Sequence, residues 1–223
     1  MTSIMRPSNP PITEKKECLS TKYLRKVARF ASKLLNTALP QDLVFHNHQH
    51  TWEVVQAAHE IGKNSGLKED KLEILMIAAW FHDIGHTIQY KGHEEASKQI
   101  ATEYLEKINY PNEKIIQVLD CIEATRMPQN PTSLMGRVMC DADLYHFTLS
   151  SYPNKKELLR KEWELVFNKI YSDKAWNEMN LDFLKMHRYR SNYGETVLSQ
   201  RKVQNINRCE EYCRIHGSPS ARE

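Results

Sequence analysis

Glycine is scarce in this chain, with only 7 residues among 223. Globular proteins ordinarily contain about 7% glycine, so this composition disfavours a turn-dense β-sandwich and a Gly-rich phosphate-binding loop. Long apolar runs are lacking as well. The longest, residues 74–81, spans eight positions, whereas a membrane helix needs about 20. The first residues contain no apolar signal-peptide core, so we expect neither a membrane partner nor export.

The cysteines follow no recognisable pattern. The five of them include no Cys-x-x-Cys pair, which argues against a zinc ribbon and against a disulfide framework. A chain of this length can bury a core without disulfide bonds. Reduced thiols are typical of a cytoplasmic protein, which is the location we expect.

No charge of one sign dominates, because 31 Lys and Arg face 28 Asp and Glu, a net charge of +3. A nucleic-acid-binding protein would more often concentrate basic residues on one face, so this partner is disfavoured. Residues 30–187 hold 17 basic and 22 acidic residues, a net charge of −5. An acidic middle that is rich in histidine hints at a metal-dependent centre, although scattered charge explains the balance equally well.

Helical periodicity covers most of the chain. Apolar residues recur every three or four positions, and no segment alternates convincingly as a strand would. We predict an all-α fold with one helical domain over residues 18–190. A flexible arm, residues 1–17, precedes it, and a polar C-terminal helix and tail, residues 191–223, follow. Asp70 is expected to begin a helix that runs to about Ile84, and Asn47 to cap the helix that carries His50.

Ligand-type side chains gather in four short blocks, which are Phe45-His46-Asn47-His48-Gln49-His50, His82-Asp83-Ile84-Gly85-His86, Gly92-His93-Glu94 and Cys140-Asp141-Ala142-Asp143. Asp83 continues the apolar stripe of its predicted helix, so we expect its carboxylate to point at the core, where an unpaired charge is costly. Asp143 also follows an apolar position, four residues after Met139, and His50 shares its helix face with Val54 and Ala58. Inward-facing side chains of this kind on separate helices build metal sites, and nitrogen with oxygen ligands suits transition metals better than calcium.

Each of these residues alone has an ordinary interpretation. A single inward histidine is more often a hydrogen-bonded core residue, and a single inward aspartate is more often a cap or half of an ion pair. Four of them together, all on inward faces, favour the metal site.

The order His50, His82-Asp83, Asp143 resembles the H…HD…D signature of the HD-domain metal-dependent phosphohydrolases. Residues 45–50 are similar to the Tyr-His-Asn-x-x-His opening of many members, residues 78–86 to the helix that carries the HD pair, and residues 141–144 to the closing Asp-Ala-Asp-Leu. The resemblance covers about residues 45–147. Within the superfamily, the chain resembles the small uncharacterised members that are described as predicted metal-dependent HD phosphohydrolases.

The resemblance implies a divalent ion bound by His50, His82, Asp83 and Asp143. Members that bind two metals add further histidines between the HD pair and the last aspartate. His86 and His93 are the only histidines in that interval, and none lies between Glu94 and Asp143. This departure favours one ion, and the sequence does not distinguish among Mn, Fe, Co, Ni, Zn and Mg.

The implied activity is hydrolysis of a phosphate ester by a metal-activated water, in a nucleotide or another small phosphorylated metabolite. The enzyme would be a phosphomonoesterase or a phosphodiesterase. The candidate catalytic residues are His86, His93, His46 and Glu94. The candidate phosphate-binding cations are Lys91 and Arg126.

Two alternatives stay open at this point. One is an iron-dependent oxygenase of the same fold, and the other is a module that binds a ligand or metal without turnover. The intact His82-Asp83 pair argues against the second. Asp141 is either a partner of a metal ligand or a surface charge, His48 is expected to face away from the site, and the oligomeric state is not indicated.

Overall fold

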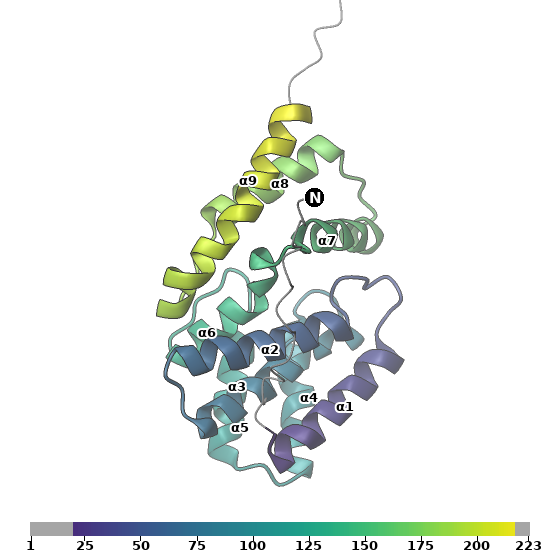
Figure 1. Ribbon diagram of the computed structural model, residues 1–223. Helices are drawn as coiled ribbons and strands as arrows, with labels where there is room; N and C mark the ends of the chain where they lie inside the picture. Colours follow the sequence, from purple (N-terminus) through teal and green to yellow (C-terminus); the bar gives the residue numbers. More distant parts are fainter. Residues whose placement is uncertain (1–19, 217–223) are drawn as a thin grey trace, which may run out of the picture.

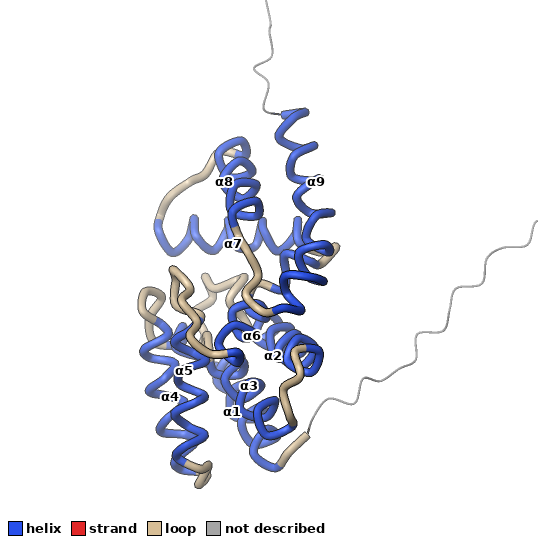
Figure 2. The backbone as a smooth tube through the Cα atoms, turned by 90° about the vertical axis from the view of Figure 1, so that its left-hand side faces the viewer, coloured by secondary structure: helices blue, strands red, loops and turns tan. Residues whose placement is uncertain are grey.

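The computed structural model describes residues 20–216, so the predicted arm at residues 1–17 and the end of the predicted tail lie outside the described residues. Every regular element in this range is helical (Figure 2), which confirms the all-α prediction. The order is α1 (Lys22–Ala38), α2 (His48–Asn64), α3 (Glu69–Phe81), η1 (Ile84–Thr87), α4 (His93–Lys107), α5 (Asn112–Ala124), α6 (Leu134–Asp143), η2 (Tyr145–Thr148), α7 (Tyr152–Phe167), α8 (Asp173–Met186), η3 (Gly194–Leu198) and α9 (Ser199–His216).

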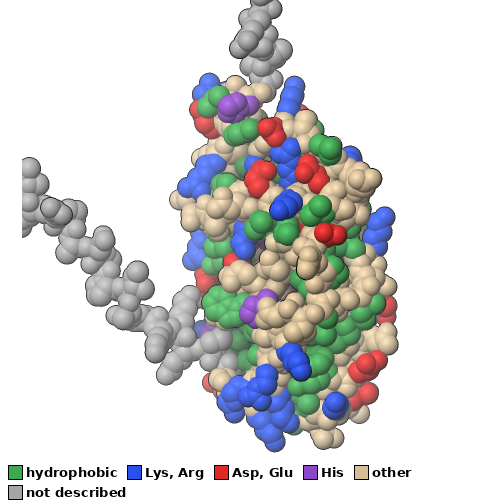
Figure 3. All heavy atoms as spheres, turned by 90° about the vertical axis from the view of Figure 1, so that its right-hand side faces the viewer, with side chains coloured by type: hydrophobic (Ala, Val, Ile, Leu, Met, Phe, Trp, Pro, Cys, Tyr) green, Lys and Arg blue, Asp and Glu red, His purple; other side chains and the backbone are tan. Residues whose placement is uncertain are grey.

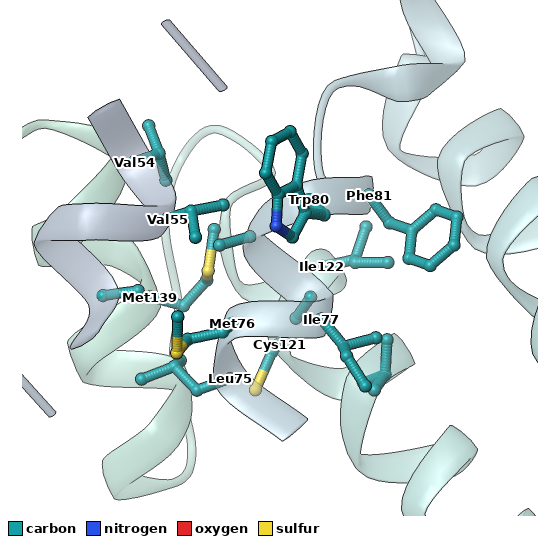
Figure 4. Packing of buried hydrophobic residues seen from close by; sticks show 14 of the residues in the cluster. Val54, Val55, Leu75, Met76, Ile77, Trp80, Phe81, Cys121, Ile122 and Met139 are labelled. Atoms are coloured by element: carbon teal, nitrogen blue, oxygen red, sulfur yellow. The ribbon is translucent and has the colours of Figure 1, made fainter. Parts of the chain in front are cut away.

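Helix α3 is the centre of the main core. Its residues from Leu72 to Phe81 are all buried, which explains why residues 74–81 form a continuous apolar run rather than a stripe on one face. Helices α1, α2, α4, α5 and α6 all contact it. Figure 4 shows Val54 and Val55 of α2 and Met139 of α6 packed near the α3 side chains. A helix enclosed on all sides is a rigid base for the residues that follow it.

The C-terminal helices form a second layer of the molecule. Figure 1 draws α7, α8 and α9 at one end of the bundle that α1 to α6 build. A smaller apolar cluster joins them to η2 and consists of Leu144, Phe147, Tyr152, Leu184 and Cys209. Helix α9 packs against α8, with Lys202, Asn205 and Cys209 on its buried face.

Local chemistry sets the helix ends that matter for the site. The side chain of Asn47 accepts hydrogen bonds from the backbone N–H groups of Gln49 and His50, as the sequence predicted. The expectation for Asp70 is wrong, because Lys68 is the N-cap and Asp70 lies in the first turn, where its charge favours the helix dipole. Helix α3 also ends earlier than predicted, at Phe81, and the chain turns through His82 and Asp83 into η1.

Surface charge is mixed over much of the molecule. On the face drawn in Figure 3, Lys and Arg side chains gather at the lower end, and acidic, basic and hydrophobic side chains alternate above them. Within residues 20–216, none of the helices combines the length and the hydropathy that crossing a bilayer requires.

Candidate metal centre

The ends of three helices bring two histidines and two aspartates together. His50 lies in the first turn of α2, His82 and Asp83 directly follow α3, and Asp143 is the last residue of α6. Nε2 of His50 lies 3.3 Å from Oδ2 of Asp83 and 3.5 Å from Oδ1 of Asp143. Nε2 of His82 lies 3.1 Å and 3.5 Å from the same two oxygens. The structure therefore places the four predicted ligands around one point.

The unsatisfied atoms of this cluster fit a metal ion. Nε2 of His50, Nε2 of His82 and Oδ2 of Asp83 are buried without a hydrogen-bond partner among the described residues. One ligand atom from each of these three residues lies within 4.8 Å of the others. Buried polar atoms ordinarily have partners, and imidazole with carboxylate is a donor set that divalent transition metals favour. These side chains fit a resident divalent ion.

His82 is oriented from behind by the backbone. Its Nδ1 donates a hydrogen bond to the carbonyl oxygen of Ala79 at 2.8 Å, one turn back in α3. With the proton on Nδ1, the lone pair of Nε2 points at the two aspartates. The tautomer that a metal ligand needs is thus fixed by the helix itself.

The histidines and aspartates of the cluster shift one another's pKa values. Burial opposes the charged form of His82, but the neighbouring carboxylates of Asp83 and Asp143 raise the pKa of His82 well above its ordinary value. The same balance raises the pKa of His50. In return, the imidazoles overcome burial and hold the pKa of Asp83 well below its usual range. The carboxylates stay ionised, which is the form in which they bind metals.

Three more histidines line one side of this centre. The rings of His86 and His93 are stacked with centroids 3.8 Å apart, and His46 lies 4.8 Å from His86. Nε2 of His93 is 3.2 Å from Oδ1 of Asp83. Ligand atoms of His46, Asp83 and His86 also lie within 4.8 Å of one another, so Asp83 belongs to two overlapping groups of metal-ligand type. Burial lowers the pKa of His86 to about 2, which keeps that ring neutral.

A close contact between η1 and α4 creates the His86–His93 stack. The N–H of Gly85 donates to Oγ of Ser97 at 2.8 Å, and the hydroxyl of Ser97 donates to the carbonyl of His82 at 2.7 Å. A Cβ atom on Gly85 would lie 2.0 Å from the carbonyl oxygen of His93. Only glycine permits this approach.

Residues 47–148 match the family model described as HD domain. These residues form an HD domain. The match contains α2 to α6 with His50, His82, Asp83 and Asp143, so the cluster described above lies within that domain.

Similar proteins agree with this assignment. A Clostridium tetani protein described as deoxyguanosinetriphosphate triphosphohydrolase-like is 33% identical over 129 residues, which cover 56% of this chain and 32% of that protein. The chain thus spans about a third of the length of this curated relative.

Two solved structures share the fold. A predicted HD superfamily hydrolase from an uncultured Thermotogales bacterium gives a TM-score of 0.57 at 16% identity, over 88% of this chain and 94% of that one. A Lactobacillus plantarum protein gives a TM-score of 0.66 at 15% identity, over 91% of this chain and all of the other. Both likenesses reach well beyond the HD domain itself.

The remaining predicted site residues lie at different distances from the centre. Glu94 is buried beside His93, with 3.9 Å between its Oε2 and Nδ1 of His93. Arg126 lies 3.4 Å from Glu94 but also pairs with Glu123 at 2.6 Å. Lys91 is exposed, and its Nζ lies 5.7 Å from the centroid of the Phe167 ring rather than against the His and Asp cluster.

The contacts of His48 and Asp141 show that neither residue takes part in the centre. His48 faces α1, where its Nε2 lies 2.9 Å from Oγ of Ser32, so it points away from the centre as expected. Asp141 is fully buried and accepts hydrogen bonds from the backbone N–H groups of Arg190 and Ser191 at 2.6 Å and 2.9 Å. It therefore anchors the segment before η3 and is neither a surface charge nor a partner of a metal ligand.

Sequence reasoning missed Glu162 and Tyr90. Glu162 lies on α7, outside the HD domain, and is fully buried against His46. The hydroxyl of Tyr90 donates to Oε1 of Glu162 at 3.0 Å. The only local signal is an acidic residue on the inward face of an amphipathic helix, which does not reveal its partner.

Proposed function

We propose that this chain is a divalent-metal-dependent phosphohydrolase that cleaves a phosphate ester by means of a metal-activated water. The observation that carries the proposal is the convergence of His50, His82, Asp83 and Asp143, with three of their ligand atoms buried and without a hydrogen-bond partner within residues 20–216. When bound there, a divalent ion supplies Lewis acidity toward a phosphoryl oxygen and lowers the pKa of a water toward neutrality.

The surrounding histidines suit phosphate recognition and proton transfer. Burial opposes the charged form of His93, but the carboxylate of Asp83 raises the pKa of His93, which favours the protonated form that can donate a proton. His86 stays neutral and offers one N–H and one lone pair, because neither of its ring nitrogens has a partner among the described residues. His46 is the third proton-transfer candidate, on the side facing α7.

The cationic residues have less direct roles. Arg126 would contact a phosphate only by leaving Glu94 and Glu123, and Lys91 only by swinging away from Phe167. Glu94 is placed to orient His93 or Arg126. We assign Lys91 and Arg126 to the outer part of a substrate, where exposed charges act mainly on binding rather than on the chemical step.

The substrate that the proposal names is a nucleotide or another small phosphorylated metabolite. The name of the Clostridium relative points to nucleotides. The histidine-lined side of the centre offers several nitrogen groups to a polyanionic phosphate. One fold can serve many substrates, so the substrate class has to be tested by assaying several phosphorylated compounds.

The direct experiment is a phosphate-release panel on the full chain, freed of metal with a chelator and reloaded with Mn, Mg, Co or Ni. The panel contains nucleoside mono-, di- and triphosphates, a cyclic nucleotide and simple aryl phosphates. We expect metal-dependent release from at least one member, and loss of it in Asp143→Asn but not in the exposed α5 control Asp120→Asn. No release with any metal at full occupancy would favour a module that binds without turnover.

The overlapping group of His46, Asp83 and His86 supports one other candidate, an iron-dependent oxygenase with two ions. Elemental analysis and an oxygen electrode separate the two functions. Two iron ions per chain together with oxygen consumption would replace the hydrolase proposal.

A further inference from the structure

Helix α7 contributes a buried acid to the edge of the metal centre. Figure 1 draws this helix between the α1–α6 bundle and the α8–α9 pair. It lies beyond residue 148, where the HD domain match ends. The side chain of Glu162 has no solvent exposure, and a buried carboxylate persists only when its oxygens are satisfied.

Four donors from the neighbourhood of the site satisfy Glu162. Its Oε2 accepts from the backbone N–H groups of Phe45 and His46 at 2.8 Å and 2.9 Å. Its Oε1 contacts Nδ1 of His46 and accepts from the hydroxyl of Tyr90. Burial alone would raise the pKa of Glu162, but these contacts with His46 and the backbone lower it, so the group is an anion.

The contact between Glu162 and Nδ1 of His46 determines which ring nitrogen can meet a substrate. With Nδ1 directed at Glu162, Nε2 is the ring nitrogen that remains available to other groups. The ring lies beside the metal centre, with centroids 4.8 Å from His86 and 5.7 Å from His50. It also keeps about a fifth of its side-chain surface exposed, with 20% accessible, so a substrate atom can reach it.

We propose that Glu162 is a positioning residue for His46, holding the proton on Nδ1 toward α7 so that Nε2 faces the reacting phosphate ester. This inference rests on the proposed hydrolase function. As water oxygen bonds to phosphorus and the bond to the leaving oxygen breaks, the leaving oxygen keeps the electron pair and takes the Nε2 proton of the doubly protonated His46 ring. The ring is left neutral, with its remaining proton on Nδ1 against Glu162. A carboxylate that orients an imidazole in this way is a recurring device of acid–base catalysis.

A purely structural role for Glu162 makes a different prediction. Helix α7 has a second attachment to the HD domain, because Nζ of Lys155 lies 2.7 Å from Oε2 and 2.9 Å from Oε1 of Glu53 on α2. This ion pair does not touch His46. If Glu162 only fastens α7, breaking either attachment should have similar consequences, whereas a positioning role confines the catalytic effect to Glu162.

The test compares Glu162→Gln with the matched control Lys155→Gln in the full chain. The amide keeps the shape of the side chain but has one accepting oxygen instead of two. It cannot accept both from the backbone N–H groups of Phe45 and His46 and from the His46 ring with the Tyr90 hydroxyl. Long-range ¹H–¹⁵N NMR, in protein loaded with diamagnetic Mg or Zn, reports which nitrogen of His46 carries the proton, with His46→Gln identifying the signal. We expect the Nδ1–H form in the unaltered chain and in Lys155→Gln, and a mixture in Glu162→Gln.

Kinetics supply the second arm. Metal affinity and KM should stay within about threefold in Glu162→Gln, while kcat falls roughly 10²-fold, as expected for impaired acid–base catalysis. The double variant Glu162→Gln with His46→Gln should be no slower than His46→Gln alone, because the carboxylate acts through that ring.

Three outcomes would overturn the inference. These are an unchanged His46 tautomer in Glu162→Gln, an equal loss of kcat in Lys155→Gln, or an additive loss in the double variant. Absence of phosphate release from the unaltered chain with every metal would instead refute the proposed function, and with it the proton-transfer step. In that case the NMR arm still decides whether Glu162 orients His46.

Discussion

Replacing Gly85 with alanine tests how the histidine-lined side of the centre is built. The added Cβ would lie 2.0 Å from the carbonyl oxygen of His93 and 2.6 Å from the backbone nitrogen of Ser97. Both are backbone atoms at the start of α4, so no side-chain rotation relieves the clash. Helix α4 must move away from η1 as a unit.

The expected cost follows from two terms. Forcing a methyl group into a packed interior costs about 1–3 kcal/mol. The shift also breaks the two hydrogen bonds that Ser97 makes with Gly85 and His82, each contributing about 0.5–1.5 kcal/mol. The free energy of unfolding should therefore fall by about 2–6 kcal/mol.

Urea unfolding of the metal-free chain measures this loss as a lower midpoint at unchanged m. The control is Gly62→Ala, where the nearest atom is the flexible end of the Leu72 side chain at 2.7 Å. Gly62 lies inside α2, so alanine gains about 1 kcal/mol of helix propensity that offsets the contact. A Gly85→Ala variant as stable as the control would refute the close-approach argument.

Three further predictions concern the centre itself. Asp83→Ala should weaken metal binding by more than about 100-fold, because about 100-fold is the upper range for losing a residue that only supports a ligand. Activity should vanish with the metal. A metal affinity within tenfold of that of the unaltered chain would contradict the assignment of Asp83 as a ligand. His93→Ala should retain the metal but lower turnover by about 10²-fold or more, and loss of the metal would mean that His93 is a ligand and that more than one ion binds. Since the pKa values of His50 and His82 are raised, both rings are protonated below those values and compete with the metal. Calorimetry in two buffers at pH 7 should detect up to about two protons released per metal, with affinity rising from pH 6 to 8, and a pH-independent affinity would speak against this balance.

The helical fold was predictable because its signals are local. Periodic apolar residues and scarce glycine leave few alternatives to helices. Asn47 caps α2 by contacts within three residues. The end of α3 was harder to place, since His82 and Asp83 continue a helical pattern in the sequence but lie in the turn that leads to η1. Whether the chain stays helical there depends on the packing of Gly85 against α4, which is a tertiary contact.

The candidate centre was predictable for a related reason. The four predicted ligands are next to buried helix positions; they are His50, His82, Asp83 and Asp143. Ligand-type side chains among apolar residues can be recognised from the sequence alone. Glu162 does not, because its partner His46 is 116 residues away and only the docking of α7 brings the two together. The local sequence of α7 shows only that Glu162 lies on the inward face of the helix, which does not identify its partner.

The central claim is that one divalent ion is held by His50, His82, Asp83 and Asp143. A crystal soaked in Mn, with diffraction data collected for anomalous scattering, tests it most directly. We expect an anomalous peak within about 2.0–2.3 Å of ligand atoms from all four side chains. No peak there, or a peak bound only by His46, His86 and Asp83, would contradict it.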